Sequence, residues 1–315
     1  MPDGTLIDLA GTALRAGLGA ASFKSMQAMI DAGDKGLAAA RSLLANGVEL
    51  IPAGDDARLL APLPLPLQIR DCLSFETHLK NAFESVLKMN ARREADPAQA
   101  EVAMRASGRY VLPDVWYKQP IYYKANRFAI SAPEDEILWP DYSDVMDYEL
   151  EIACVIGKGG RDIAAKDAEA HIFGYTIFND FSARDAQGVE QMGMLGPAKG
   201  KDFDGANAFG PVIVTPDELP DPYALTMRAR VNGELWTDGS TATMHWRFPQ
   251  IIEHISRSET LHAGEIIGSG TVGWGCGLEH MKFLNDGDVV ELEIEGIGTL
   301  RNRVRQSDTK RNARV

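Results

Sequence analysis

From residue 110 onward, hydrophobic and polar residues alternate in short segments that Gly, Pro, Asn and Asp separate. Alternation with a period of two is typical of β-strands. It occurs in YYKANRFAIS, YELEIACVIG, FGYTIFN, GPVIVT, LTMRARVNGELW and DVVELEIEGIGTL. The Asn-Gly pair in RVNGELW predicts a hairpin. Because only two helices are expected between these strands, at 167–173 and 248–257, the pattern predicts an α+β, mostly β fold: a mixed β-sandwich or roll.

The first part of the chain has a different pattern. Residues 22–46 place apolar side chains at helical spacing, and Gly47 follows as a C-cap. The segments 48–53 and 57–67 predict short strands or extended connectors, because prolines interrupt the second. We therefore place a boundary near residue 68, between an N-terminal helical and extended arm or small domain (1–68) and a catalytic domain (69–315).

A second helix is expected at 74–88, with Ser74 as its N-cap. Its apolar positions recur at helical spacing and would form one buried stripe: Phe75, Leu79, Ala82, Phe83 and Val86. No internal repeat of 20–50 residues is visible, which argues against a solenoid.

Composition narrows the function classes. The 315 residues include 32 basic and 45 acidic side chains, a net charge of −13, which argues against a nucleic-acid or anionic-membrane partner. No apolar run approaches the ~18 residues of a membrane span. The three cysteines form no CxxC pair, which supports neither disulfides nor a zinc-thiolate site, and the N-terminus MPDGTLIDLAG lacks a secretory pattern. We expect a cytoplasmic protein with free thiols.

Glu149 and Glu151 form the most distinctive local pattern. In an alternating strand they share one face, about 6.6 Å apart at Cα, while Leu150 and the next apolar residues take the other. Two neighbouring carboxylates repel each other unless a cation lies between them, and oxygen ligands favour Mg²⁺, Mn²⁺ or Ca²⁺. A solvated strand face also carries such pairs, and residues 291–295 (ELEIE) repeat the pattern with nothing nearby that suggests chemistry.

The segment NDFSARDAQ, which follows Glu149 and Glu151 along the chain, distinguishes this pair from the glutamates of residues 291–295. It follows the apolar strand GYTIF and would present Asp180 at the strand end as a third oxygen ligand. Arg184 and Gln187, three residues apart, could face the same way on a helical turn.

Taken together, these segments closely resemble the fumarylacetoacetate hydrolase superfamily over residues 70–310. The resemblance rests on DYELEIACVIGKGGRDI, GYTIFNDFSARDAQ, KGKDFDGANAFGPVIVT, VNGELW, GEIIGSGTVGWGCGLE and DGDVVELEIEGIGTL, in that order. It implies the fold of that family, with a small N-terminal arm, and a homodimer paired through the sheet domain.

The resemblance also implies a ligand set. The family's metal ligands correspond to Glu149, Glu151 and Asp180, and an Asp seven residues before the family's catalytic His corresponds to Asp71. The implied cofactor is Mg²⁺, or alternatively Mn²⁺ or Ca²⁺.

The same resemblance implies catalytic groups. His78 corresponds to the general base. The acylpyruvase-like members orient it with H-x-x-E, but this chain has Asn81 at that place, so the orienting acid is matched to Glu279. Oxyanion donors correspond to Arg184, Gln187 and Lys201, with Lys199 as the competing lysine, and substrate contacts to Tyr123 and Thr271.

Residues 268–273 (GSGTVG) also fit the dinucleotide pattern GxGxxG. That pattern requires a helix directly after it, and WGCGLE does not predict one. A glycine-lined substrate wall is the preferred interpretation.

The resulting hypothesis is an enzyme that hydrolyses a C–C bond in a β-diketo acid such as an acylpyruvate. The metal stabilises an enolate and His78 activates water. The alternatives are an isomerase, tautomerase or decarboxylase of 2-oxo or 2-hydroxy-diene dioates, as in aromatic meta-cleavage, and then a 2-hydroxy-dienoate hydratase. In every case the partner is a small-molecule 2-oxo acid. The presence of His78 argues against a purely metal-binding module.

Overall fold

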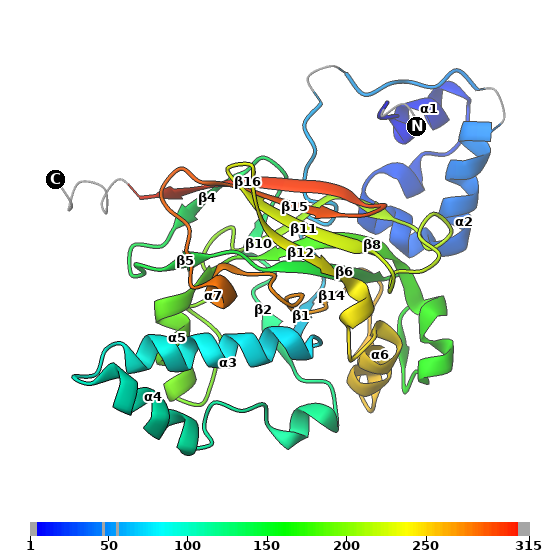
Figure 1. Ribbon diagram of the computed structural model, residues 1–315. Helices are drawn as coiled ribbons and strands as arrows, with labels where there is room; N and C mark the ends of the chain where they lie inside the picture. The colour runs from blue at the N-terminus through cyan, green and yellow to red at the C-terminus, as the bar shows by residue number, and fades with distance from the viewer. Residues whose placement is uncertain (1–4, 46–47, 55–56, 308–315) are drawn as a thin grey trace.

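Two β-sheets pack face to face in a computed structural model that describes residues 5–45, 48–54 and 57–307 (Figure 1). The larger sheet has seven strands, in spatial order β2 (Tyr122–Ala125), β1 (Ile69–Cys72), β14 (Ile266–Gly268), β6 (Leu150–Ile156), β8 (Ile172–Asp180), β10 (Asn207–Val214) and β3 (Ile130–Ser131). The pairs β1–β14 and β10–β3 are parallel and the other pairs are antiparallel. The sheet is therefore mixed, as the sequence predicts.

The smaller sheet has five strands, in the order β12 (Glu234–Ser240), β11 (Thr226–Val231), β15 (Val289–Ile294), β16 (Gly298–Gln306) and β4 (Glu136–Trp139). Two short pairs complete the strands: β13 (Thr260–Leu261) with β7 (Gly160–Arg161), and β5 (Met146–Asp147) with β9 (Ser182–Ala183). Alternate residues of β6, including Leu150 and Ile152, pack with Leu292 and Leu300 of the smaller sheet in the main core. The predicted apolar face of β6 is thus the face between the sheets.

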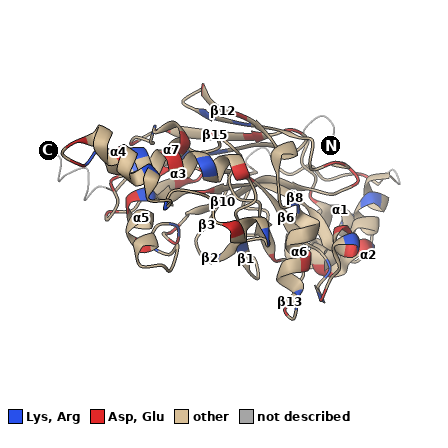
Figure 2. Ribbon diagram, turned by 60° about the horizontal axis from the view of Figure 1, so that its bottom comes forward, with Lys and Arg blue, Asp and Glu red and all other residues tan. Residues whose placement is uncertain are grey.

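The helices that follow residue 68 are α3 (Glu76–Ala91), α4 (Pro97–Ala106), α5 (Arg184–Met192), α6 (Phe248–Ser256) and α7 (Gly277–His280), with 3₁₀ turns η2 (Asp114–Tyr117), η3 (Ala165–His171) and η4 (Thr241–Thr243). The buried residues of α6, such as Phe248 and Ile252, belong to the core between the sheets. Helix α3 packs against α4 and α7, below both sheets in Figure 1. Acidic and basic residues alternate along α3 and α4 (Figure 2), where Glu84 pairs with both Lys88 and Arg105.

The N-terminal part contains α1 (Leu9–Arg15), η1 (Ala21–Phe23) and α2 (Met26–Ala45). Gly33 has non-helical backbone angles, with a φ of 54°, and interrupts α2. A residue without a Cβ adopts this conformation most easily. Met29 and Ile30 of α2 pack on the outer face of the larger sheet, against residues such as Val155. This segment therefore covers part of the sheet, and the boundary at residue 68 stays a prediction.

Most predicted elements are confirmed, including α6 and the hairpin, whose turn residues Asn232 and Gly233 both have positive φ. Two details are wrong. Phe75, and not Ser74, is the N-cap of α3, because the Ser74 backbone pairs with Ser269 and its hydroxyl caps nothing. The helix expected at 167–173 is the 3₁₀ turn η3, which ends before β8 begins.

The buried side of α3 also differs from the predicted stripe. Leu79 is buried there, but Val86 is only half-buried, and His78, Ser85 and Leu87 are buried instead. The expected cap at Gly47 lies outside the described residues. Within the described part of the chain, no helix combines the length and apolar character needed to cross a bilayer.

Candidate active site

Three carboxylates meet on the outer face of the larger sheet. Asp71 lies in β1, Glu151 in β6 and Asp180 at the end of β8, and one oxygen of each lies within 4.8 Å of the others. All three are at most 3% exposed. Because side chains alternate, they share the face of apolar residues two positions away along their strands, namely Ile69, Ala153 and Phe178. The N-terminal helix α2 covers the apolar end of this face, and the carboxylates occupy the other end.

Glycines of β14 and the following loop make room for this group. β14 lies between β1 and β6, and a Cβ on Gly268 would approach Asp71 Oδ1 to 2.5 Å and Glu151 Oε2 to 2.9 Å. The N–H of Gly270, at a positive φ of 79°, donates to both carboxylates at 3.1 and 3.0 Å. The GxGxxG segment therefore contacts the carboxylates. The expectation that WGCGLE forms no helix is wrong, because the short helix α7 begins at Gly277, although residues 274–276 separate it from the glycine segment.

Lys201 and Arg184 neutralise the negative charge of Glu149, which the sequence also predicted as a metal ligand. The Nζ of Lys201 lies 2.6 Å from Glu149 Oε2 and also contacts Asp180, while Nη1 of Arg184 lies 2.8 Å from Glu149 Oε1. Burial raises the pKa of Glu149, but the two cations outweigh it and hold that pKa well below its usual value. Glu149 is therefore outside the group of three described here, and its role as a metal ligand stays a prediction.

In the other three carboxyls the effect of burial prevails over that of nearby cations. It raises the pKa of Asp71 to about 6 and that of Asp180 to about 7, and it raises the pKa of Glu151 well above its usual range. Tyr123 donates its hydroxyl to Asp180 Oδ2 at 2.7 Å, so this predicted substrate contact touches the carboxylate group directly.

The group has the properties of a site for a hard divalent cation. Glu151 Oε1 and Asp180 Oδ1 are buried oxygens without a hydrogen-bond partner among the described residues. Leaving such atoms unpaired costs about 1–3 kcal/mol each, and more when they are charged. A bound dication would satisfy both oxygens, and an all-oxygen ligand set suits Mg²⁺, Mn²⁺ or Ca²⁺ better than Zn²⁺.

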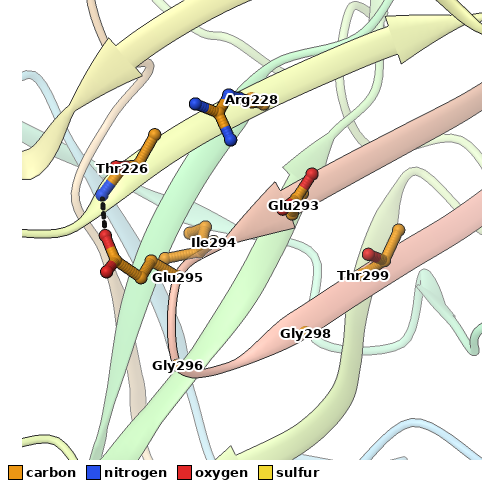
Figure 3. A pocket seen from close by; sticks show the side chains of 8 residues that line it. All are labelled: Thr226, Arg228, Glu293, Ile294, Glu295, Gly296, Gly298 and Thr299. Atoms are coloured by element: carbon orange, nitrogen blue, oxygen red, sulfur yellow. Dashed lines mark hydrogen bonds between the residues drawn. The ribbon is translucent and has the colours of Figure 1, made fainter.

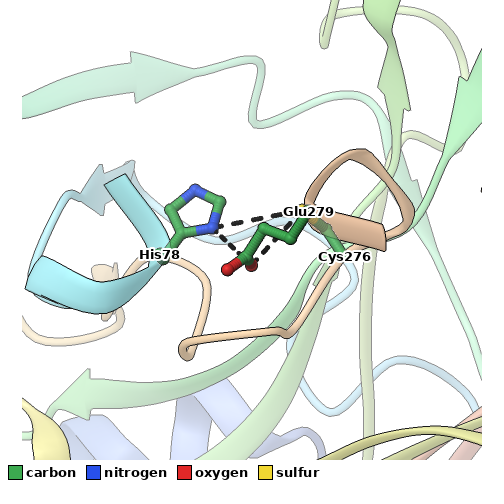
Figure 4. Close-up of side chains that lie close together, drawn as sticks. All are labelled: His78, Cys276 and Glu279. Atoms are coloured by element: carbon green, nitrogen blue, oxygen red, sulfur yellow. Dashed lines mark hydrogen bonds and ion pairs between the residues drawn. The ribbon is translucent and has the colours of Figure 1, made fainter. Parts of the chain in front are cut away.

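His78 and Glu279 form a buried pair (Figure 4). Nδ1 of His78, on α3, lies 2.8 Å from Glu279 Oε1, on α7, and the other ring nitrogen points away from the carboxylate. Because a carboxylate only accepts hydrogen bonds, Nδ1 carries the proton and Nε2 is the acceptor. The arrangement suits a base at Nε2.

Glu279 is held by further donors that the sequence did not indicate. Asn81 Nδ2 donates to Oε2 at 2.8 Å, and the N–H groups of Trp274 and Gly275 donate at 2.7 and 3.0 Å. Asn81 lies one turn after His78 on the same face of α3, and this spacing was the available signal.

Asp147 is a second residue that the sequence analysis missed. Its buried carboxylate accepts from Arg184 Nε at 2.8 Å and from the N–H groups of Gly277 and Leu278 at 2.7 and 2.9 Å. It thus fixes both Arg184 and the start of α7, which carries Glu279. No local pattern marks it, since Arg184, Gly277 and Leu278 lie at least 37 positions away.

The remaining predicted residues have different surroundings. Gln187 is half-buried and accepts from Arg184 at 3.0 Å, and Thr271 is buried in the loop after β14. Of the two competing lysines, Lys201 contacts the carboxylates, whereas Lys199 is exposed over the ring of Tyr142.

The second run of glutamates belongs to the surface. Glu293 pairs with Arg230 at 3.0 Å, and Glu295 accepts from the Thr226 N–H at 3.1 Å. They line an open hollow of about 460 Å³ beside β11, β15 and β16 (Figure 3). The interpretation of these residues as a solvated strand face is confirmed.

Comparison with known proteins gives consistent results. Residues 91–305 match the family described as fumarylacetoacetate (FAA) hydrolase C-terminal. Oxaloacetate tautomerase YisK of Bacillus subtilis is 34% identical over 79% of this chain and 73% of its own length. The mitochondrial oxaloacetate tautomerase FAHD2B of Bos taurus is 41% identical over 59% of each chain, so the match spans less than two thirds of that relative.

Solved structures agree. Fumarylacetoacetate hydrolase from Exiguobacterium antarcticum is 30% identical, with a TM-score of 0.69 over 96% of this chain and 93% of its own. The 5-carboxymethyl-2-hydroxymuconate delta-isomerase from Mycobacterium smegmatis is 28% identical, with a TM-score of 0.62 over 83% and 84%. The fold of this chain, the order of its motifs and these matches together show that it belongs to the fumarylacetoacetate hydrolase family.

Proposed function

We propose that this protein is a divalent-metal-dependent tautomerase or isomerase that interconverts the keto and enol forms of a 2-oxo dicarboxylate. The observation that carries the proposal is the buried group of Asp71, Glu151 and Asp180 with its two unpartnered oxygens. Relatives named for oxaloacetate tautomerisation and for isomerisation of a hydroxymuconate support this chemistry. They favour it over hydrolysis of a C–C bond, which is the main hypothesis from the sequence.

The three carboxylates would hold the ion. A dication bound there would polarise the 2-oxo group and stabilise the enolate that forms when the neighbouring carbon loses a proton. Nε2 of His78 takes that proton and returns it, while Glu279 keeps the ring oriented and stabilises its charged form.

Arg184 would recognise a substrate carboxylate. Its Nη2 is a buried donor with no partner among the described residues, and its other nitrogens are fixed by Asp147, Glu149 and Gln187. A guanidinium held in this way can donate to an anionic substrate without rearranging.

Hydrolysis of an acylpyruvate C–C bond is the second candidate. It is favoured by the His78–Glu279 pair, because the same nitrogen can take a proton from water. Both candidates require the enolate, and they differ in whether water attacks a carbonyl carbon.

A substrate panel separates the candidates. Oxaloacetate, a 2-oxo-heptenedioate and an acylpyruvate are incubated with Mg²⁺ or Mn²⁺, before and after EDTA, while enol absorbance, CO₂ and cleavage products are followed. We expect enol–keto conversion that EDTA stops and added metal restores. Faster cleavage of the acylpyruvate than tautomerisation would select hydrolysis, and CO₂ release as the main product would select decarboxylation.

The chain provides a matched control for this assay. Glu151→Gln removes one carboxyl group from the buried site, and Glu293→Gln makes the same change in the same type of sequence pattern on the outward face of β15. Only the first variant is expected to lose activity. The homodimer and the cytoplasmic location stay predictions, and light scattering in solution checks the former.

A further inference from the structure

Cys276 joins His78 and Glu279 in a second cluster of metal-binding side chains (Figure 4). Its Sγ lies 3.6 Å from Glu279 Oε1 and 4.0 Å from His78 Nδ1. All three residues are buried, and none belongs to the group of Asp71, Glu151 and Asp180. The three side chains converge although 198 positions separate Cys276 from His78, so no local sequence motif reveals them.

The three ligand atoms are spaced suitably for one small ion. With sides of 2.8, 3.6 and 4.0 Å, their triangle has a centre about 2.1 Å from each atom, close to the Zn–N and Zn–O bond lengths of about 2.0–2.2 Å. A Zn–S bond of about 2.3 Å needs only a small shift of the thiolate.

The donor set differs in chemical character from the all-oxygen group. Nitrogen, sulfur and a single carboxylate favour Zn²⁺, Cd²⁺ or Co²⁺, whereas Mg²⁺ and Ca²⁺ do not compete for thiolate. The donors to Glu279 from Asn81 and from the Trp274 and Gly275 backbone would keep this ligand in place, as partners behind metal ligands do.

We propose that His78, Cys276 and Glu279 form a second metal site, which binds Zn²⁺ or another thiophilic dication and blocks the base. Binding replaces the His78–Glu279 hydrogen bond with bonds to the ion, so the ring proton moves from Nδ1 to Nε2, where it occupies the nitrogen that would act as base, and the thiol proton is released. The ring is then tied to the ion and Glu279 no longer orients it as a base. Inhibition of turnover rests on the proposed function, but binding of the ion does not.

Cobalt provides the test of binding, because a cobalt–thiolate bond adds a near-ultraviolet charge-transfer band that oxygen ligands do not give. The full chain, already loaded with excess Mg²⁺, is titrated with Co²⁺ and then Zn²⁺. We expect one Co²⁺ per chain with this band, displaced by Zn²⁺. Wild-type protein without the band overturns the proposal, whether or not any substrate is turned over.

Two cysteine variants assign the ligand. Cys276→Ala should lose the band and weaken Zn²⁺ binding more than about 10-fold, the lower end of the loss seen when even a partner behind a ligand is removed. Cys154→Ala, which changes another buried free thiol in β6, should keep both. Circular dichroism checks that each variant is folded, and a band that survives in folded Cys276→Ala contradicts the assignment.

The rate measurement distinguishes inhibition at this cluster from simple replacement of the activating ion. Inhibition by Zn²⁺, measured relative to each variant's own uninhibited rate, should persist at high Mg²⁺ in the wild type and decrease in Cys276→Ala. Equal inhibition in both proteins that excess Mg²⁺ reverses would place the zinc at the carboxylates and overturn the inhibitory role.

Discussion

The Nζ of Lys201 lies 2.6 Å from Oε2 of Glu149, and both side chains are buried. Lys201 also contacts Asp180. A carboxylate that the sequence predicted as a metal ligand is therefore compensated by an ammonium group, which stands directly beside one of the three carboxylates that would hold the ion.

This relationship predicts opposite effects on metal binding and turnover. Lys201→Met removes a positive charge that repels the dication and leaves Glu149 paired with Arg184 alone. Metal affinity should therefore rise by about tenfold or more, since unit charges 4 Å apart interact by about 4 kcal/mol at an effective dielectric constant of 20. Turnover should fall about 10²–10³-fold, as when a preorganised donor is lost. Calorimetry measures the metal affinity and initial rates measure the turnover, and Lys199→Met, at an exposed lysine, is the control. Weaker metal binding would contradict this account.

Metal affinity should depend on pH. With folded-state pKa values of about 6 and about 7, Asp71 and Asp180 keep protons that they lose near pH 4 when unfolded. Their protonation therefore stabilises the metal-free fold at low pH, and this contribution is lost as pH rises through 6 and 7. Metal binding must displace these protons, so affinity should increase between pH 5 and 8.

Two measurements check this dependence. Titrations in buffers of different ionisation enthalpy should show proton release that is larger at pH 6 than at pH 8. The increase in melting temperature on adding metal should widen over the same range. An affinity that stays constant from pH 5 to 8 would exclude protonated carboxyls as the competitor.

Gly268→Ala should disrupt the metal site, and its added Cβ would also approach Cδ1 of the buried Phe178 ring to 2.9 Å. The added Cβ would lie 2.5 Å from Asp71 Oδ1, closer than real contacts allow, so the carboxylates must separate. We expect metal affinity to fall at least about tenfold. Gly19→Ala, where a Cβ meets nothing within 4 Å, is the matched control. Calorimetry that finds equal affinities for the two variants would show that the site tolerates the methyl group.

The residues around His78 should rank in a defined order. His78→Ala removes the base and should lower turnover about 10²–10⁴-fold. Asn81→Ala removes only one donor to Glu279, so its loss should be near tenfold, since one hydrogen bond to a charged group is worth about 1.5–3 kcal/mol at most. Initial rates at saturating metal give the order, and a larger loss for Asn81→Ala than for His78→Ala would reverse the assignment.

Local pattern predicted the strands but could not distinguish the two glutamate pairs. Glu151 and Glu293 occur in the same alternating context, and both lie on interior strands and face away from the core between the sheets. Glu151 is buried beside Asp71 and Asp180 of other strands, whereas Glu293 is half-buried and pairs with Arg230. The decisive fact is which strands neighbour each pair, and that is a property of topology. The motif order in the resemblance provided this information, and alternation did not.

Residues missed by the sequence analysis share a reason. Asn81 and Asp147 act through partners that lie far along the chain: for Asn81 only its spacing from His78 was a signal, and the residue type of Asp147 carries none. The same reason applies to the surroundings of Glu149. Alternation predicted that it lies beside Glu151, but could not show that Lys201 and Arg184 form ion pairs with it.

The last prediction concerns Asp147, the residue that joins Arg184 to α7. Asp147→Asn keeps the shape but leaves Arg184 with one fewer counter-charge in the interior and weakens acceptance from the Gly277 and Leu278 N–H groups. Removing one partner of a buried ion pair costs about 3–5 kcal/mol of unfolding free energy. Asp238→Asn, which breaks the exposed pair with Arg228, should cost at most about 1 kcal/mol.

Denaturant unfolding at pH 7 measures both variants. Because Asp147 also fixes the start of the helix that carries Glu279, the folded Asp147→Asn protein should additionally lose turnover while keeping its metal affinity, since none of the three carboxylates touches Asp147. Equal unfolding free energies for the two variants would mean that the buried pair contributes no more than the surface pair. A folded variant with full turnover would mean that Arg184 and α7 are positioned without it.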